Sequence, residues 1–351
     1  MTSPQRKSFG SDNHAGAHPA ILSAVLAANA GDATAYGDDP LTEQTVSRLR
    51  EAFGAAAAFL VFGGTAANVL GLSLLVRPFE AVICAESAHL NENECGATER
   101  ALGSKLLAVP TPDGKLTPGL MAARLAGRGD AHHAQPRAVE IAQATEVGTC
   151  YTLRELQEIR EFCDEHDLLL YMDGARLANA AAHLGCTLAE LAGHADVLSL
   201  GGTKNGALGA EAVIVMNEAH AVAAPYQRMQ LMQLASKMRF LAAQFGALLD
   251  DGLWLRNASQ ANRMARRLAD GLAGMPGFRL AYPAEANGVF AVLPAAQASR
   301  LQQDWNFHVW ADLPGGECVA RWMTAFDTTE ADVDEFIAAI RVTAGHGHPV
   351  A

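Results

Sequence analysis

Four short polar segments each follow an apolar run, and together they hold the residue types of a reactive site. Each segment supplies a group that can do chemistry: Gly63-Gly64-Thr65 after AFLVF, His89 after AVICA, Asp173 with Arg176 after LLLYM, and Lys204 after DVLSL. Taken singly, a glycine turn is usually only a turn, and a lone histidine or loop lysine is usually structural or solvated. The four segments together indicate a functional site because their chemical groups are complementary.

These groups match the parts of one cofactor. Glycines and a hydroxyl at the start of a helix bind phosphate through free backbone N–H groups and the helix dipole. A lysine amine condenses with an aldehyde, a carboxylate keeps a pyridine nitrogen protonated, and a flat imidazole covers a ring face. Phosphate, aldehyde and pyridine together describe pyridoxal 5′-phosphate, for which proteins supply a lysine and an acidic partner of the ring nitrogen. The pattern therefore predicts this cofactor.

The apolar runs that precede these segments predict strands of one sheet. We expect strands at 58–62, 81–85, 105–109, 137–142, 168–172, 196–200 and 211–216, alternating with helices. One of these helices, at about 152–166, has an apolar face, with Thr152 and Glu155 as its capping pair. Such alternation predicts an α/β fold with a mainly parallel sheet. Ligands bind beyond the carboxyl ends of such strands, so the four segments should meet at one edge.

The rest of the chain predicts a second, smaller unit. From about residue 228 the pattern is mainly helical, and short strand-like pieces between 278 and 326 precede a final helix at about 329–343. A chain of 351 residues is long for a single core. We predict an N-terminal segment near the active site (1–20), a large cofactor-binding domain (21–254) and a smaller α+β domain (255–351).

Composition and net charge argue against some classes of binding partner and some cellular compartments. The net charge is −12 and the sequence pI about 5.4, which argues against a nucleic-acid partner. No apolar stretch reaches the ~18 residues of a membrane span, and the first residues lack the apolar region of a signal peptide. Six scattered cysteines without a CxxC motif predict neither disulfides nor a metal site. We expect a cytoplasmic protein with a small-molecule substrate.

Longer motifs make the resemblance to a known family specific. DGAR at 173–176, followed by GTKNG at 202–206, resembles the L-threonine aldolase family of the low-specificity or L-allo-threonine type. Four more segments resemble family motifs: SDNHAGAHP (11–19), AYGDDP (35–40), FGGTAAN (62–68) and ESAHL (86–90). The resemblance covers about residues 8–345. It implies a fold-type-I pyridoxal-phosphate enzyme of aspartate-aminotransferase-like architecture, related to the β-eliminating lyases.

The resemblance also implies a reaction and a set of roles. The family cleaves β-hydroxy-α-amino acids, such as L-threonine, L-allo-threonine or phenylserine, to glycine and an aldehyde. For the cofactor, the implied roles are that Lys204 holds it, Asp173 pairs with its ring nitrogen, His89 stacks on the ring, Arg176 lies beside it, and Gly63, Gly64 and Thr65 hold its phosphate. For the substrate, Arg176 and Arg321 bind the carboxylate with help from Ser11, and Tyr36 shapes the pocket from a neighbouring subunit. The implied assembly is a homotetramer with shared active sites.

Some features depart from the family or leave choices open. The base that takes the β-hydroxyl proton is either His89 or His133, and His132 is adjacent to the latter. Relatives place a lysine of the partner subunit near the phosphate, in the region around 226–233. This chain has Arg228 there, and we expect Arg228 to bind the cofactor in place of that lysine, with a different geometry. Gln143-Ala144-Thr145-Glu146 replaces a Glu-Asn-Thr-His type of segment, so polar contacts to the cofactor or substrate should differ.

Other functions stay open at this stage. The same electron sink serves β-elimination or transamination, and the sequence does not separate these from aldol cleavage. A binding protein that has lost activity is a further alternative, against which the joint presence of Lys204, Asp173 and His89 argues. A dinucleotide-binding oxidoreductase is disfavoured, since no GxGxxG with an acidic residue ~20 positions later follows the first strand.

Overall fold

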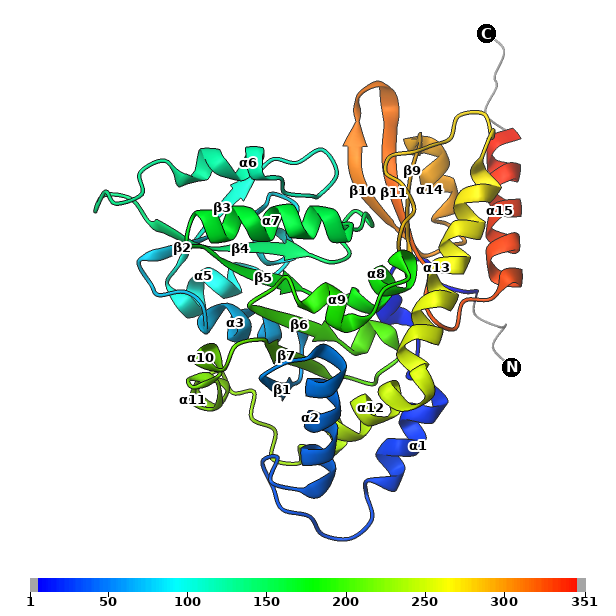
Figure 1. The fold of residues 1–351 in the computed structure, drawn as a ribbon. Coiled ribbons are helices and arrows are strands. Elements are labelled where there is room, and N and C mark those ends of the chain that lie inside the picture. The colour runs from blue at the N-terminus through cyan, green and yellow to red at the C-terminus, as the bar shows by residue number, and fades with distance from the viewer. Residues whose placement is uncertain (1–5, 346–351) are drawn as a thin grey trace.

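Residues 6–345, the part of the chain that the structure describes, form two β-sheets in this computed structural model (Figure 1). The larger sheet has seven strands in the order β1-β7-β6-β5-β4-β2-β3. Their bounds are Ala57–Val61 (β1), Glu80–Ala85 (β2), Lys105–Val109 (β3), Gln135–Ala142 (β4), Leu169–Asp173 (β5), Val197–Gly201 (β6) and Glu211–Val215 (β7).

Strand direction decides which residues meet at the edges of this sheet. β3, β2, β4, β5 and β6 are parallel, and β7 is antiparallel to both of its neighbours, β6 and β1. β1 therefore runs in the same direction as the parallel strands. The carboxyl ends of six strands lie at one edge, where the antiparallel β7 begins. The prediction of a mainly parallel sheet is confirmed.

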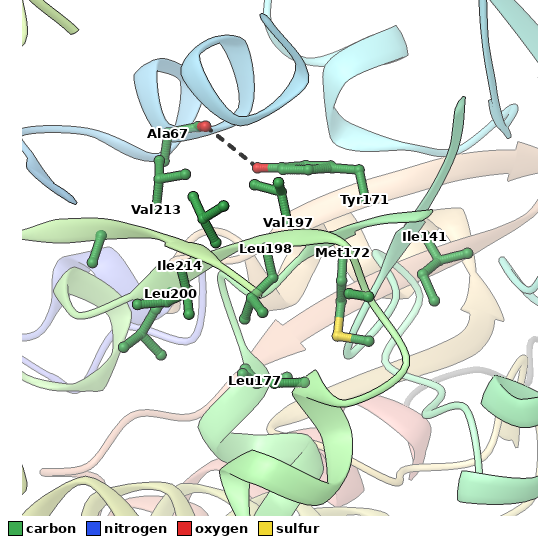
Figure 2. Packing of buried hydrophobic residues seen from close by; sticks show 14 of the residues in the cluster. Ala67, Ile141, Tyr171, Met172, Leu177, Val197, Leu198, Leu200, Val213 and Ile214 are labelled. Atoms are coloured by element: carbon green, nitrogen blue, oxygen red, sulfur yellow. Dashed lines mark hydrogen bonds between the residues drawn. The ribbon is translucent and has the colours of Figure 1, made fainter. Parts of the chain in front are cut away.

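Helices cover both faces of the sheet. α3 (Gly64–Ser73) packs across β5, β6 and β7 and beside α5 (Ala97–Leu102), while α7 (Leu153–Glu165), α8 (Leu177–Leu184) and α9 (Leu188–Ala192) cover the opposite face. Figure 2 shows the alternation that this requires: Tyr171 points toward Ala67 of α3, and Met172 points toward Leu177 of α8. Because successive strand residues face opposite sides, Asp173 shares the α3 face with Tyr171.

The smaller sheet has the order β10-β11-β9-β8 and is antiparallel throughout. Its strands are Arg279–Leu280 (β8), Gly288–Pro294 (β9), His308–Leu313 (β10) and Glu317–Met323 (β11). α14 (Ala295–Leu301) and α15 (Glu330–Gly345) pack beside it, and the long α13 (Leu253–Leu272) contacts both α8 and α15. The core of this unit includes an aromatic cluster in which the rings of Phe9, Trp305 and Phe336 contact one another and Trp322 contacts Phe336.

The remaining helices complete the outline of the molecule (Figure 1). They are α1 (Pro19–Ala27), α2 (Pro40–Phe53), α4 (His89–Glu92), α6 (Pro118–Ala122), α10 (Glu218–Ala221), α11 (Ala224–Gln230) and α12 (Arg239–Leu249). Within residues 6–345, none of the helices combines the length and the apolar character needed to cross a membrane.

The seven predicted strands of the large sheet are all present, each within two residues of the expected bounds. The predicted capping box also forms, because Thr152 and Glu155 each accept the other's backbone N–H at the start of α7. The predicted boundary between residues 254 and 255 falls in the first turn of α13. The division into domains stays a prediction, and residues 1–5 and 346–351 of its terminal parts lie outside the described residues.

Candidate active site

A cavity at the carboxyl edge of the large sheet brings all four predicted segments together. Its walls include these predicted residues: Gly64, Thr65, His89, Asp173, Arg176 and Lys204. They come from the loops and turns that follow β1, β2, β5 and β6. The convergence follows from the topology, because these strands run in one direction and end at one edge.

Lys204 lies in a single turn, Thr203–Asn205, directly after β6. The turn begins with glycines because the backbone is crowded there: a Cβ on Gly201 would lie 2.4 Å from the carbonyl oxygen of Ala175. The Arg176 guanidinium and burial both lower the pKa of Lys204. A lowered pKa increases the neutral fraction of the amine, which is the form that attacks a carbonyl carbon.

Asp173 ends β5, and its buried carboxylate is held by three donors. Oδ2 accepts a hydrogen bond from Asn68 Nδ2 at 2.8 Å. Oδ1 accepts the N–H of Ala175 at 2.8 Å and the hydroxyl of Ser199 at 3.4 Å. These bonds fix the position of the carboxylate in the wall of the cavity, where it can hold a protonated ring nitrogen.

His89 begins α4, and both its backbone and its ring are anchored. Its N–H donates to Glu146 Oε1 at 2.9 Å, and its Nδ1 lies 2.9 Å from Glu94 Oε1. The Glu94 side chain is fully buried, whereas the His89 side chain is 42% exposed and lines the cavity. Burial, together with the nearby Asp173 carboxylate, raises the pKa of Glu146 to about 7.

The start of α3 forms a cradle for an anion at the other side of the cavity. Gly63 is the N-cap, and the first bond within the helix runs from Ala67 N–H to Gly63 O. The preceding N–H groups of a helix have no intrahelical partner, and the dipole makes this end positive. A Cβ on Gly63 or Gly64 would meet open space, so the backbone there is accessible to a bound phosphate. Thr65 adds a hydroxyl.

Arg176 lines the cavity, and Arg321, from the smaller sheet, lies close enough to Arg176 to interact with it electrostatically. Arg176 donates to Asp12 through Nε at 2.7 Å and Nη2 at 3.0 Å. Burial acts to raise the pKa of Asp12, but Arg176 and Lys204 outweigh it and hold that pKa at about 2. Arg321, on β11, donates to the carbonyl of Gly10 at 3.2 Å, and its buried Nε has no hydrogen-bond partner within residues 6–345.

The structure does not bring His133 to this cavity. His133 lies in the loop before β4, with an exposed side chain whose Nε2 is 3.7 Å from Asp130 Oδ2. The cavity touches the opposite end of the same strand, at Ala142. β4 has eight residues, so its ends are about 23 Å apart at a rise of about 3.3 Å per residue. Within one chain, His89 is the histidine that lines the cavity.

Like Arg321, three further predicted residues are absent from the lining of the cavity in their own chain. Tyr36 is 54% exposed in the loop before α2. Ser11 accepts the N–H of Asn13 at 3.2 Å and caps a short 3-10 turn. Arg228 sits over the ring of Phe59, 5.5 Å from its centroid, and burial lowers the pKa of its guanidinium. Contacts from Tyr36 or Arg228 to a cofactor therefore require a second chain.

Sequence reasoning missed five polar residues of the site: Asp12, Asn68, Glu94, Ser199 and Glu211. Asn68 carried a signal, as a polar residue inside the apolar helix pattern AANVLGLSLL. Asp12 lies within the SDNHAGAHP motif and Glu94 shortly after ESAHL, but neither is in a strand-end position. Glu211 lines the cavity because β7 is antiparallel and begins at the same edge at which the parallel strands end.

The side chains of this cavity fit the parts of pyridoxal 5′-phosphate. The start of α3 offers a positive cradle for a phosphate, Lys204 an amine of lowered pKa for an aldehyde, and Asp173 a fixed carboxylate for a ring nitrogen. The seven-stranded sheet with this site defines the fold-type-I class of pyridoxal-phosphate enzymes. Arg176 and Arg321 add cations for the carboxylate of an amino acid.

Comparison with known proteins agrees with this class. The family model described as beta-eliminating lyase matches residues 8–296. A low specificity L-threonine aldolase of a Pseudomonas species is 45% identical over 343 residues, covering 96% of this chain and 98% of the relative. The chain belongs to the β-eliminating lyase family.

Solved structures show the same architecture. The threonine aldolase of Leishmania major superposes with a TM-score of 0.91 at 33% identity, covering 97% of this chain and 100% of that chain. The serine palmitoyltransferase of Sphingomonas wittichii gives a TM-score of 0.75 at 16% identity, with 98% and 88% coverage, and shares the fold.

Proposed function

We propose that this protein is a pyridoxal-phosphate-dependent aldehyde-lyase that cleaves L-threonine, L-allo-threonine and related β-hydroxy-α-amino acids to glycine and an aldehyde. The observation that carries the proposal is the single cavity that joins an amine, a fixed carboxylate, the start of a helix and the Arg176 guanidinium, with Arg321 close to Arg176. The names of the Pseudomonas relative and the Leishmania structure, low specificity L-threonine aldolase and threonine aldolase, support the choice of reaction.

In this proposal the cofactor is held by residues of the described cavity. Lys204 binds its aldehyde carbon, Asp173 its ring nitrogen, and Gly63, Gly64 and Thr65 its phosphate. When bound, pyridoxal phosphate supplies an electron sink for the bond that breaks at Cα of the amino acid. Residues of this chain then determine which bond that is.

Substrate orientation falls to the arginines. Asp12 already holds Arg176 in place. Burial lowers the pKa of Arg321 most, and the nearby Arg176 guanidinium lowers it further. Both guanidinium groups stay charged, so they pair with the substrate carboxylate through charge-assisted bonds. A fixed carboxylate leaves the β-hydroxyl on the side of His89, whose free ring nitrogen takes the hydroxyl proton as Cα–Cβ breaks.

The test is a product measurement on the holoenzyme. With L-allo-threonine or L-threonine as substrate, we expect acetaldehyde and glycine in equal amounts, with acetaldehyde followed by a coupled alcohol dehydrogenase. Formation of a keto acid and ammonium without glycine would instead identify β-elimination. A protein that binds the cofactor and yields neither set of products would contradict catalysis on these substrates.

We further propose a homotetramer in which sites are shared between subunits. An exposed apolar surface beside the helix cradle supports this, formed by Tyr36, Phe62, Tyr226, Met229 and Met232. Its parts are tied together: Phe62 N–H donates to Gln233 at 3.2 Å, and Tyr36 N–H donates to the carbonyl of Ser236 at 2.9 Å. Phe62 directly precedes the phosphate cradle, so a covering subunit would lie beside the cofactor.

Light scattering tests the assembly, with four chains expected and a monomer contradicting it. Mixing tests the sharing of sites. Chains with Tyr36→Ala and chains with Lys204→Ala should regain activity when co-assembled if Tyr36 serves a neighbour's site. We also propose a cytoplasmic location, which is supported by six cysteines that are all free thiols. Cell fractionation checks this.

A further inference from the structure

A chain of hydrogen bonds connects Asp173 with His89 through two residues that the proposed function does not use. Asn68, 2% exposed in the second turn of α3, has one side-chain nitrogen between two carboxylates. Nδ2 donates to Asp173 Oδ2 at 2.8 Å and to Glu94 Oε1 at 2.9 Å. The same Glu94 oxygen lies 2.9 Å from His89 Nδ1.

Donor and acceptor chemistry fixes the orientation of the Asn68 amide. Carboxylates accept and do not donate, so the amide NH₂ must be the part that faces them. The amide oxygen then points the other way, where it accepts the Tyr171 hydroxyl at 2.9 Å. Both hydrogens of the amide are used, and a rotated amide would lose two bonds to charged groups.

The same chemistry decides which nitrogen of His89 carries hydrogen. Glu94 Oε1 can only accept, so Nδ1 of His89 donates to it. The backbone of His89 is fixed independently by its bond to Glu146. Nε2 is therefore the nitrogen left for the cavity that His89 lines.

We infer that Asn68 and Glu94 are positioning residues that join His89 and Asp173 into one unit, with Glu94 keeping the His89 proton on Nδ1. The inference rests on the proposed function for its catalytic meaning: a neutral imidazole protonated on Nδ1 presents Nε2 as a base. It also explains how the ring-facing histidine and the ring-nitrogen carboxylate keep their spacing, because one amide of α3 binds both. The start of the same helix forms the phosphate cradle.

The placement of Glu94 agrees with a role beyond packing. Its side chain is fully buried, and its second oxygen, Oε2, has no hydrogen-bond partner within residues 6–345. A buried polar atom without a partner lowers the stability of the fold. A carboxylate selected for stability alone would have both oxygens satisfied.

The experiment reads the position of the proton directly. Ring ¹⁵N chemical shifts of histidine distinguish a protonated from an unprotonated nitrogen, and the His89 signals are assigned by their loss in His89→Asn. Spectra of the holoenzyme are compared for wild type, Glu94→Leu and Glu94→Gln. The matched control is Glu92→Leu, which removes an exposed carboxylate from α4, two residues away.

We expect wild type and Glu92→Leu to carry the proton on Nδ1, and Glu94→Leu to carry it mainly on Nε2. Glu94→Gln keeps an acceptor oxygen and should restore the Nδ1 proton. In parallel, kcat should fall about tenfold to hundredfold in Glu94→Leu, the scale of a general base, with a much smaller change in KM and partial rescue in Glu94→Gln.

Wild-type protein with the His89 proton on Nε2 would overturn the inference, even if no Glu94 variant folds. A Glu94→Leu protein that keeps the Nδ1 proton would overturn it as well. The two claims separate cleanly: if the wild type releases no aldehyde, the proposed function fails, while the ring-nitrogen spectra still decide how His89 is held.

Discussion

A histidine lies at each edge of the seven-stranded sheet, and the surroundings of the two histidines differ. His89, after the carboxyl end of β2, has its backbone and its ring held by two glutamates and lines the cavity. His133, before the amino end of β4, has a side chain that is 58% exposed, with a long contact to Asp130. Both histidines are near a strand in sequence, but only His89 lines the cavity.

This difference shows that strand direction, more than residue type, determines which side chains reach the cavity. At the carboxyl edge, loops and helix starts converge and polar side chains bind one another. At the amino edge, the loop that holds Asp130 and His133 is exposed to solvent. Changes at the first edge should therefore alter catalysis, and matched changes at the second should not.

The largest effect is expected from Lys204→Ala at the carboxyl edge. Without the amine, turnover should fall to background, and the visible absorbance of lysine-bound cofactor should disappear while far-UV circular dichroism is unchanged. Lys237→Ala, which changes an exposed loop lysine, is the control. A Lys204→Ala protein that kept the visible band would show that another amine binds the cofactor.

Asp173→Asn should come next. The asparagine keeps the shape of the side chain but removes the charge that holds a ring nitrogen protonated, so cofactor should stay bound while kcat falls by about a hundredfold or more. Asp130→Asn makes the same change at the amino edge and should leave kcat unaltered. Near-wild-type kcat in Asp173→Asn would place the ring partner elsewhere.

The two histidines test the comparison itself. His89→Asn should lower kcat about tenfold to hundredfold, because a positioned base is lost. His133→Asn should have a much smaller effect, since its side chain is at the other end of β4 from the cavity. An equal or larger loss in His133→Asn would show that this histidine reaches the site of a neighbouring subunit.

The smallest effect concerns stability and pH. Burial raises the pKa of Glu211 from 4.5 to about 7. A raised pKa means that the folded state keeps a proton that the unfolded state loses, so this group's contribution to stability is complete below pH 4.5 and is lost as pH rises toward 7. Glu211→Gln should remove that loss and stabilise the cofactor-free protein by about 1 to 3 kcal/mol above pH 7.

Denaturant unfolding at several pH values measures this difference. Glu218→Gln is the control, since Glu218 is an exposed residue that follows the other end of β7. If wild type and Glu211→Gln differ by the same amount at every pH between 4.5 and 8, burial does not raise the pKa of Glu211 in this way.

The sequence carried most of the information about the carboxyl edge. Apolar runs that end in GGT, His89, Asp173 or Lys204 are local patterns, and the parallel topology turns them into one site. Asn68 and Glu94 were not predicted because their partners are distant in sequence: Asn68 binds Asp173, 105 residues away. Only the packing of α3 on β5 creates that contact.

Long-range geometry also accounts for the other differences. His133 is an exception, because it precedes the predicted strand at 137–142 and the direction of that strand already places it at the amino edge. Asp12 binds Arg176 across 164 residues, and neighbouring Ser11 was the residue that the motif suggested. Tyr36 and Arg228 lie outside the cavity of their own chain, so their predicted roles depend on an assembly that one sequence does not describe.

The most direct test of the central claim is a product balance with uniformly ¹³C-labelled L-threonine, followed by NMR with wild-type holoenzyme and with Lys204→Ala. The account predicts labelled glycine and acetaldehyde in equal amounts from the wild type and neither from the variant. Labelled 2-oxobutyrate from the wild type, without glycine, would contradict Cα–Cβ cleavage at this site.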